Sequence, residues 1–218
     1  MIYSRTAGRI IEVASAKALL PAVCIGYILP SILMLLPYES YAFWQNMIVL
    51  WQFAPIITPS LVTLIAALIQ SRLPPRKAVD LTIYDKHDLP PLRATYAFAF
   101  FLLALMHLAT MVYIAGSNTL SLSRIFAELP SPFRPWDRSN AGAAIFIFFK
   151  WDVNLSVAAA VVFCLYSIFD LRRLGYITTA KAVRTASAAV VGTFAVGPGA
   201  MYVGVWWWRE NVIAALSK

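Results

Sequence analysis

Five long apolar stretches constrain this chain more than any other feature of its sequence. Charged side chains interrupt them only near their ends, except for one pair inside the fourth stretch. A membrane-spanning α-helix needs about 20 consecutive apolar residues, so each stretch predicts one spanning helix. The predicted spans cover residues 18–36, 43–70, 94–116, 141–169 and 183–208.

The composition fits an all-α, polytopic membrane helix bundle. Hydrophobic residues make up 61% of the chain and charged residues 13%, and the mean hydropathy is +0.72. Soluble domains carry about 25% charged residues. The 218 residues leave room for five spans and short loops, which predicts one transmembrane domain, 1–218. The net charge of +8 is spread over the span ends, which favours a membrane surface over nucleic acid as the partner.

The first span has a second interpretation as a cleaved signal sequence that ends with “SYA” at Ala42. Its apolar run is long for the hydrophobic region of a signal peptide, which favours a retained anchor.

The distribution of Lys and Arg predicts the orientation. With five spans, 12 of these residues lie on the side of the N-terminus and 5 on the other side, while Lys150 lies within the membrane. The first group is Arg5, Arg9, Lys17, Arg72, Arg76, Lys77, Lys86, Arg93, Arg172, Arg173, Lys181 and Arg184, and the second is Arg124, Arg134, Arg138, Arg209 and Lys218. The positive-inside rule then predicts a cytoplasmic N-terminus and a lumenal or outer C-terminus.

Prolines and glycines predict interruptions in two spans. Pro55 and Pro59 predict a kink in the second span, because proline lacks the backbone N–H of a helical hydrogen bond. Gly197, Pro198 and Gly199 predict a break in the fifth span. Their small side chains serve either helix packing or the shaping of a cavity.

Lys150 and Asp152 are the charged pair inside the fourth span. A carboxylate at the bilayer centre costs roughly 2.5–3.5 kcal/mol on insertion scales. Lys150 is long enough to extend to the lumenal interface, whereas Asp152 is short and lies roughly 16 Å deep. We therefore expect Asp152 to face the bundle interior, to be protonated or to have a partner, which makes it the first candidate acid.

Other polar and aromatic residues are expected at similar or shallower depth on the lumenal side, which suggests a cavity with an acid at its floor. With Asp152, the candidates are Glu39, Trp44, Trp51, Gln52, His107, Trp151, Asn154, Tyr202, Trp206, Arg209 and Glu210.

Several candidates have structural alternatives. Tyr202 and Trp206 are typical of an interfacial aromatic belt, and Arg209 with Glu210 is typical of a solvated helix end. His107 stands alone in an apolar span, where a hydrogen-bonded core histidine is more common than an acid or base. The two cysteines lie in apolar spans and the two histidines stand apart, so we expect no metal and no cofactor.

Two short motifs carry a resemblance to a known family. “FFKWD” at residues 148–152 and “GPGAMYVGVWWWRE” at residues 197–210 resemble segments of the fungal integral-membrane terpene cyclases of meroterpenoid biosynthesis. The resemblance implies an enzyme of the cyclase or isomerase class that protonates an epoxide or terminal olefin of a prenylated aromatic or polyketide substrate. It further implies that no metal is needed, that the enzyme lies in the endoplasmic reticulum membrane, and that it is coupled to a membrane prenyltransferase and an epoxidase.

The resemblance leaves the second acid open. Family members are described with seven spans and two essential acids, whereas five spans are predicted here. With Asp152 as the proton donor, Glu39 or Glu210 would relay protons or deprotonate the final cation. The alternatives are a transporter or channel subunit that uses Asp152 and Lys150, and a non-catalytic scaffold in which Asp152 pairs with a partner's span.

Overall fold

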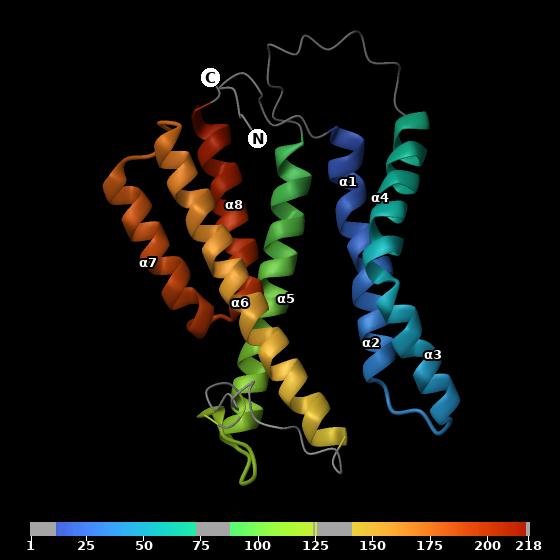
Figure 1. Cartoon of the computed structure of the whole chain (residues 1–218). Coiled ribbons are helices and arrows are strands. Elements are labelled where there is room, and N and C mark those ends of the chain that lie inside the picture. Colours follow the sequence, from blue (N-terminus) through green and yellow to red (C-terminus); the bar gives the residue numbers. More distant parts are fainter. Residues whose placement is uncertain (1–11, 73–87, 124, 126–140, 217–218) are drawn as a thin grey trace. The chain divides into compact units, whose positions relative to one another are not determined.

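The computed structural model describes residues 12–72, 88–123, 125 and 141–216 (Figure 1). The regular elements in these residues are helices. They are α1 (Val13–Val23), the π-helix η1 (Cys24–Ile28), α2 (Leu29–Leu35), α3 (Tyr41–Gln52), α4 (Ala54–Ser71), α5 (Leu89–Ala115), α6 (Ala141–Arg173), α7 (Thr179–Ala195) and α8 (Pro198–Leu216).

Four helical runs are long and apolar enough to cross a membrane. They are Val13–Leu35, Ala54–Ser71, Leu89–Ala115 and Ile145–Arg173, and they match the first four predicted spans. The prediction of a helical membrane bundle is confirmed.

The second predicted span is interrupted, as its prolines indicate. Phe53 separates the end of α3 from the start of α4. Pro55 occupies the first turn of α4, where its missing N–H costs no helical hydrogen bond. Ser40 begins α3, because its hydroxyl accepts a hydrogen bond from the backbone N–H of Phe43.

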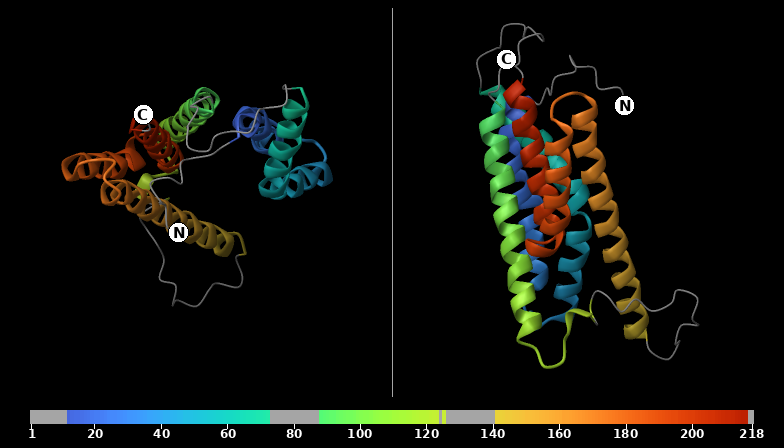
Figure 2. Two further views of the ribbon diagram at one scale, coloured as in Figure 1. Left: turned by 90° about the horizontal axis from the view of Figure 1, so that it is seen from above. Right: turned by 90° about the vertical axis from the view of Figure 1, so that its left-hand side faces the viewer.

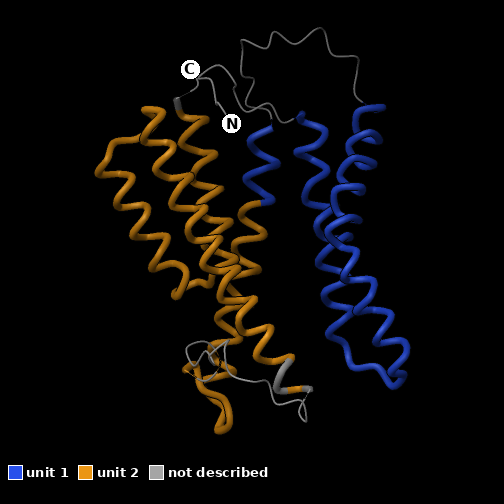
Figure 3. The backbone as a smooth tube through the Cα atoms, viewed as in Figure 1, with its two compact units in different colours: residues 1–95 blue, residues 96–218 orange. Residues whose placement is uncertain are grey.

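The chain divides into two compact units, residues 1–95 and 96–218, with the boundary inside α5 (Figure 3). In unit 1, α1 packs on α4 through small side chains. Ala14 and Ala18 of α1 meet Ala66 of α4, with Val62 and Ile65 beside them. In a bilayer, such small residues let two backbones approach and gain van der Waals contact without a hydrophobic driving force.

Unit 2 is built from the greater part of α5 together with α6, α7 and α8. The views in Figures 1 and 2 agree that α6, α7 and α8 lie side by side. Its core is formed by Cys164, Ile168, Leu171, Ile177, Ala182, Ala189, Met201, Val205 and Val212. Gly175, with a φ of 81°, ends α6 and lets the backbone N–H of Tyr176 donate to the carbonyl of Leu171, so the chain turns sharply into α7.

The segment predicted as the fifth span is a helical hairpin. α7 ends at Ala195, Gly197 adopts a φ of 92°, and α8 then runs back alongside α7 (Figure 1). The predicted break at Gly197 is confirmed, but residues 183–208 do not form the single straight span that the sequence predicts. Neither α7 nor α8 is among the four helical runs that are long and apolar enough to cross a membrane. Residues 183–208 are mostly apolar on both sides of Gly197, so hydropathy alone does not reveal the reversal.

Candidate active site

Three candidate residues lie on one face of α8. Tyr202, Trp206 and Glu210 follow each other at intervals of four residues, which places them on the same side of a helix, one turn apart. Tyr202 and Trp206 are partly buried, and Glu210 is buried. An acid is thus aligned with two aromatic rings on one helix.

Phe163 of α6 completes an aromatic cluster on this face. Its ring centroid lies 6.5 Å from that of Tyr202, nearly parallel to it, and 5.9 Å from that of Trp206. The rings of Tyr202 and Trp206 are 6.2 Å apart. Phe163 is 47% exposed, so the cluster opens onto the surface of unit 2.

The charged end of the cluster is formed by Arg209 and Glu210. The guanidinium of Arg209 lies over the ring of Trp206, 5.0 Å from its centroid. Its Nη1 is 3.5 Å from Oε1 of Glu210. One face of the indole is therefore occupied by the guanidinium in a cation–π contact. We call Phe163, Tyr202, Trp206, Arg209 and Glu210 the α8 site.

The three consecutive tryptophans point in different directions, as successive residues of a helix must. Trp206 faces the α8 site, and Trp207 lies 6.4 Å from the ring of Phe100 on α5. Trp208 packs against the core of unit 2. Gly204 gives Phe100 room at α8, because an added Cβ would lie 3.2 Å from its ring.

His107 lies at the hairpin and not in the α8 site. Its Nε2–H donates a hydrogen bond to the carbonyl oxygen of Phe194, at 3.1 Å, in the last turn of α7. Its ring also fills the space beside Gly197, where a Cβ would come within 2.6 Å of the imidazole. The contacts of His107 are those of a residue that holds the helix break together.

The fourth span carries its polar residues on several sides. Asp152 is exposed on α6, and Asn154 donates to the backbone carbonyl of Lys150 at 2.8 Å. The ammonium of Lys150 does not extend toward solvent: Lys150 is buried, and its Nζ lies 5.0 Å from the ring centroid of Phe146. The indole N–H of Trp151 is buried and has no hydrogen-bond acceptor among the residues that the structure describes.

Asp152 is far from the α8 site along unit 2. Asp152 precedes Phe163 by 11 residues of α6, which correspond to about 16 Å along the helix. Phe163 stacks on Tyr202, so the two residues lie at the same level. Tyr202 is only four residues, about 6 Å, from the start of α8. Since α6 and α8 run in the same direction (Figure 1), this spacing puts Asp152 beyond the start of α8. Its level is about 28 Å from that of Glu210, so the structure does not bring these two acids together in unit 2.

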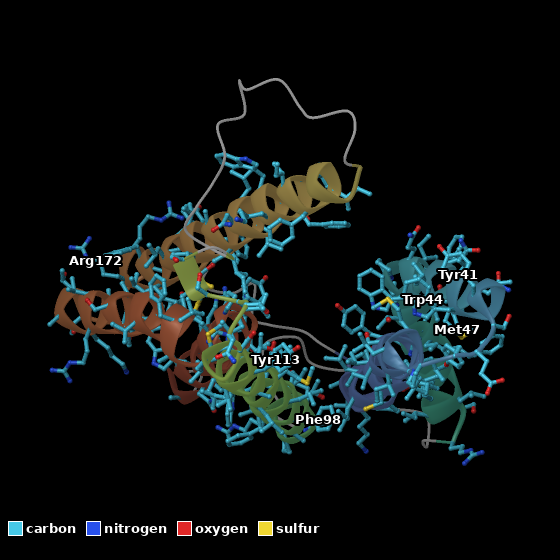
Figure 4. All side chains as sticks on the ribbon, turned by 90° about the horizontal axis from the view of Figure 1, so that it is seen from below. Tyr41, Trp44, Met47, Phe98, Tyr113 and Arg172 are labelled. Carbon is cyan, nitrogen blue, oxygen red and sulfur yellow. The ribbon has the colours of Figure 1, made fainter. Side chains whose placement is uncertain are left out.

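The remaining candidates belong to unit 1. Glu39, in the turn between α2 and α3, and Gln52, at the end of α3, are exposed. The indole N–H groups of Trp44 and Trp51 donate to the carbonyl of Met34 and the hydroxyl of Ser31, each at 3.0 Å. These two bonds attach α3 to α2, and Trp44 is labelled on α3 in Figure 4.

The sequence matches the family model described as the CtvD domain over residues 3–214, almost its whole length. The chain belongs to the CtvD-domain family. This result agrees with the resemblance to the fungal membrane terpene cyclases that its motifs indicate.

Two curated fungal proteins are similar to this CtvD-domain chain. Terpene cyclase janA of Penicillium janthinellum is 32% identical over 149 residues, which cover 67% of the chain and 38% of that protein. The FAD-dependent monooxygenase verC1 of Penicillium polonicum is 26% identical over 214 residues, 94% of the chain and 24% of that protein. The chain thus spans less than half the length of either relative. No solved structure matches it.

Sequence reasoning missed Phe163 and Phe194. Neither residue differs from its apolar neighbours in type or spacing, and each gains its role only from a helix that is distant in sequence. The pairing of α6 with α8 and of α5 with the hairpin is what identifies them.

Proposed function

We propose that this CtvD-domain chain is a membrane-embedded terpene cyclase that closes rings in a prenyl chain carried by an aromatic or polyketide head group. The observation that carries the proposal is the alignment of Tyr202, Trp206 and the buried Glu210 on one face of α8, with Phe163 stacked on it. The name of the relative janA, a terpene cyclase, supports the same chemistry.

The proposed reaction leaves the mass of the substrate unchanged. A proton adds to an epoxide oxygen or a terminal olefin carbon, and the resulting cation is attacked by the π bonds of the chain in turn. Each attack forms a carbon–carbon bond and moves the positive charge along the chain. Loss of a proton from carbon ends the sequence and restores a neutral product.

The aromatic residues of the α8 site supply what such cations need. The faces of Phe163, Tyr202 and Trp206 stabilise a positive charge by roughly 0.5–2 kcal/mol each. They also keep out the water that would capture it. The exposed edge of Phe163 gives a lipid substrate a route from the bilayer to the rings.

We assign the proton chemistry of the site to Glu210, with Arg209 as its neighbour. Glu210 would give its proton to the substrate and then, as a carboxylate 3.5 Å from the guanidinium, would take up the last proton, so that the carboxyl is regenerated. Asp152 is the second candidate acid, because a carboxyl on the exposed face of a membrane-spanning helix can meet a lipid directly. The distance between the two levels excludes joint action on one folded fifteen-carbon chain within unit 2.

The experiment compares wild type with Glu210→Gln and Asp152→Asn in membranes that contain equal amounts of protein. Each is incubated with farnesylated phenols and their terminal epoxides, and products are identified by mass spectrometry and NMR. We expect cyclised isomers from wild type, a loss of about 10²-fold or more in Glu210→Gln, and retained turnover in Asp152→Asn.

The matched control is Glu12→Gln, which neutralises an exposed carboxylate just before α1 and is expected to leave turnover unchanged. Loss of activity in Asp152→Asn with full activity in Glu210→Gln would move the acid to α6. Absence of any cyclised product from wild type across both substrate classes would reject the proposed function.

A further inference from the structure

We infer that the α7–α8 hairpin enters and leaves the membrane on the cytoplasmic side, so that the α8 site takes its substrate from the cytoplasmic leaflet. The path of the hairpin follows from geometry and charge alone. The leaflet from which the substrate enters rests, in addition, on the proposed function.

The hairpin turns inside the apolar layer. His107 contacts the turn, and α5 continues for eight residues beyond His107, about 12 Å, to Ala115. Gly197 is buried, and backbone groups beside it make hydrogen bonds within the protein. The backbone N–H of Val196 donates to the carbonyl of Gly192, and that of Met201 to the carbonyl of Gly197. A turn with its backbone satisfied in this way is tolerated at membrane depth.

The end of α8 therefore returns to the level of the α6–α7 turn. α7 has 17 residues and α8 has 19, which correspond to about 26 and 28 Å. Two antiparallel helices of nearly equal length begin and end at nearly the same depth. Val212 of α8 and Leu171, near the end of α6, accordingly share one core cluster.

The reversal improves the charge asymmetry of the whole chain. Five full spans would put Arg209 and Lys218 on the side of the membrane that has fewer basic residues. The N-terminal side would then have 12 Lys and Arg residues and the other side 5. The hairpin moves these two residues across, which gives 14 against 3, with Lys150 still within the membrane: 14, 3 and 1 account for all 18 Lys and Arg. The positive-inside rule assigns the side with 14 to the cytoplasm.

In unit 2, four basic residues lie at or near the α6–α7 turn. Arg172 and Arg173 end α6, and Lys181 and Arg184 lie in the first two turns of α7; all four are exposed. Arg172 is fixed at the turn by donating from its Nε to the hydroxyl of Thr179, at 3.0 Å (Figure 4 labels Arg172). These cations can reach the phosphates of a leaflet boundary.

The charged end of the α8 site lies nearer to this end of the hairpin than to its turn. Glu210 is six residues, about 9 Å, from the last residue of α8, and 13 residues, about 20 Å, from Gly197. A prenylated substrate with its polar head group at the cytoplasmic interface would place its chain along Trp206 and Tyr202. The reaction that supplies the substrate must then release a prenylated compound into that same leaflet.

The test uses three single cysteines at exposed positions: Ala180→Cys at the start of α7, Ala215→Cys at the end of α8 and Asn118→Cys after α5. Sealed vesicles of known sidedness are treated with a membrane-impermeant maleimide before and after permeabilisation. Wild type, whose two cysteines are Cys24 and Cys164, gives the background. We expect Ala180→Cys and Ala215→Cys to react from the cytoplasmic side, and Asn118→Cys to react only after permeabilisation.

Reaction of Ala215→Cys together with Asn118→Cys would overturn the inference, because α8 would then end on the opposite side of the membrane.

A second experiment tests the leaflet. A farnesylated aromatic acid, whose charged head group does not cross the bilayer, is added to the outside of the vesicles. Turnover that requires the cytoplasmic face supports the leaflet assignment, and turnover from the lumenal face alone overturns it. No turnover from either face, with the labelling pattern intact, counts against the proposed function and leaves the path of α8 standing.

Discussion

The imidazole Nε2 of His107 on α5 lies 3.1 Å from the carbonyl oxygen of Phe194, in the last turn of α7. The last carbonyls of a helix have no partner within it, and an unsatisfied carbonyl in hydrocarbon costs several kcal/mol. His107 therefore does for the end of α7 what water does for a helix end in solution. A histidine in an apolar span is explained by the backbone that it satisfies.

We expect His107→Ala to lower the stability of unit 2 by about 1–3 kcal/mol, because the carbonyl of Phe194 then loses its donor. His107→Gln keeps an N–H donor of similar reach and should recover much of this loss. The measurement is thermal unfolding in detergent, followed by the fluorescence of the seven tryptophans. Equal losses in both variants would show that the ring shape, not the hydrogen bond, matters.

We expect Gly197→Ala to be destabilising by about 2 kcal/mol or more. Its φ of 92° is unfavourable for an L side chain, and the new Cβ would lie 2.6 Å from the ring of His107. Gly192→Ala is the matched control five residues earlier, where the nearest atom is 3.7 Å away and the backbone is helical. The same unfolding assay should show no loss in Gly192→Ala, and a similar decrease in both variants would contradict the argument.

The cation-stabilising role of the aromatic cluster predicts a graded effect on turnover. Phe163→Leu keeps an apolar side chain but removes the ring that stacks on Tyr202, so we expect the cyclisation rate to fall about 2–30-fold. Tyr113→Leu removes an aromatic ring that is exposed on α5 (Figure 4) and should leave the rate unchanged. Early-quenched, partly cyclised products from Phe163→Leu would support the role further, and an unchanged rate and product pattern would oppose it.

In unit 1, we expect Gly26→Ala to disturb the contact between the π-helix and α4. The added Cβ would lie 2.8 Å from the hydroxyl oxygen of Thr58 and 3.0 Å from its Cα, which belongs to the backbone and moves only with its helix. Overpacking of this kind costs about 1–3 kcal/mol. Gly116→Ala, with 3.5 Å to the nearest atom, is the control, and the two melting temperatures should differ by several degrees in detergent.

The spans could be predicted from the sequence because their signal is local. Runs of apolar residues identify the four long helices, and Pro55 and Gly197 mark the two interruptions. The direction of the chain after Gly197 could not be predicted, because a positive φ at one residue reverses it without changing hydropathy. That single angle sets the direction of α8, which carries Arg209 and Glu210.

The candidate site could be predicted in part for the same reason. The spacing of Tyr202, Trp206 and Glu210 is visible in the sequence as three residues four apart. Phe163 joins them only through the pairing of α6 with α8, and Asp152 is separated from them by the same pairing. Contacts between helices depend on which helix faces pack against each other, and residue type alone does not reveal which faces these are.

The turn at Gly197 also brings together two helix ends of opposite polarity. The carboxyl end of α7 carries a partial negative charge and the amino end of α8 a partial positive charge, each about half an elementary charge. Because only Val196 and Gly197 separate the two helices, these charges nearly cancel. The most deeply placed break in unit 2 is therefore close to electrically neutral, and a bilayer can hold it without a counter-ion.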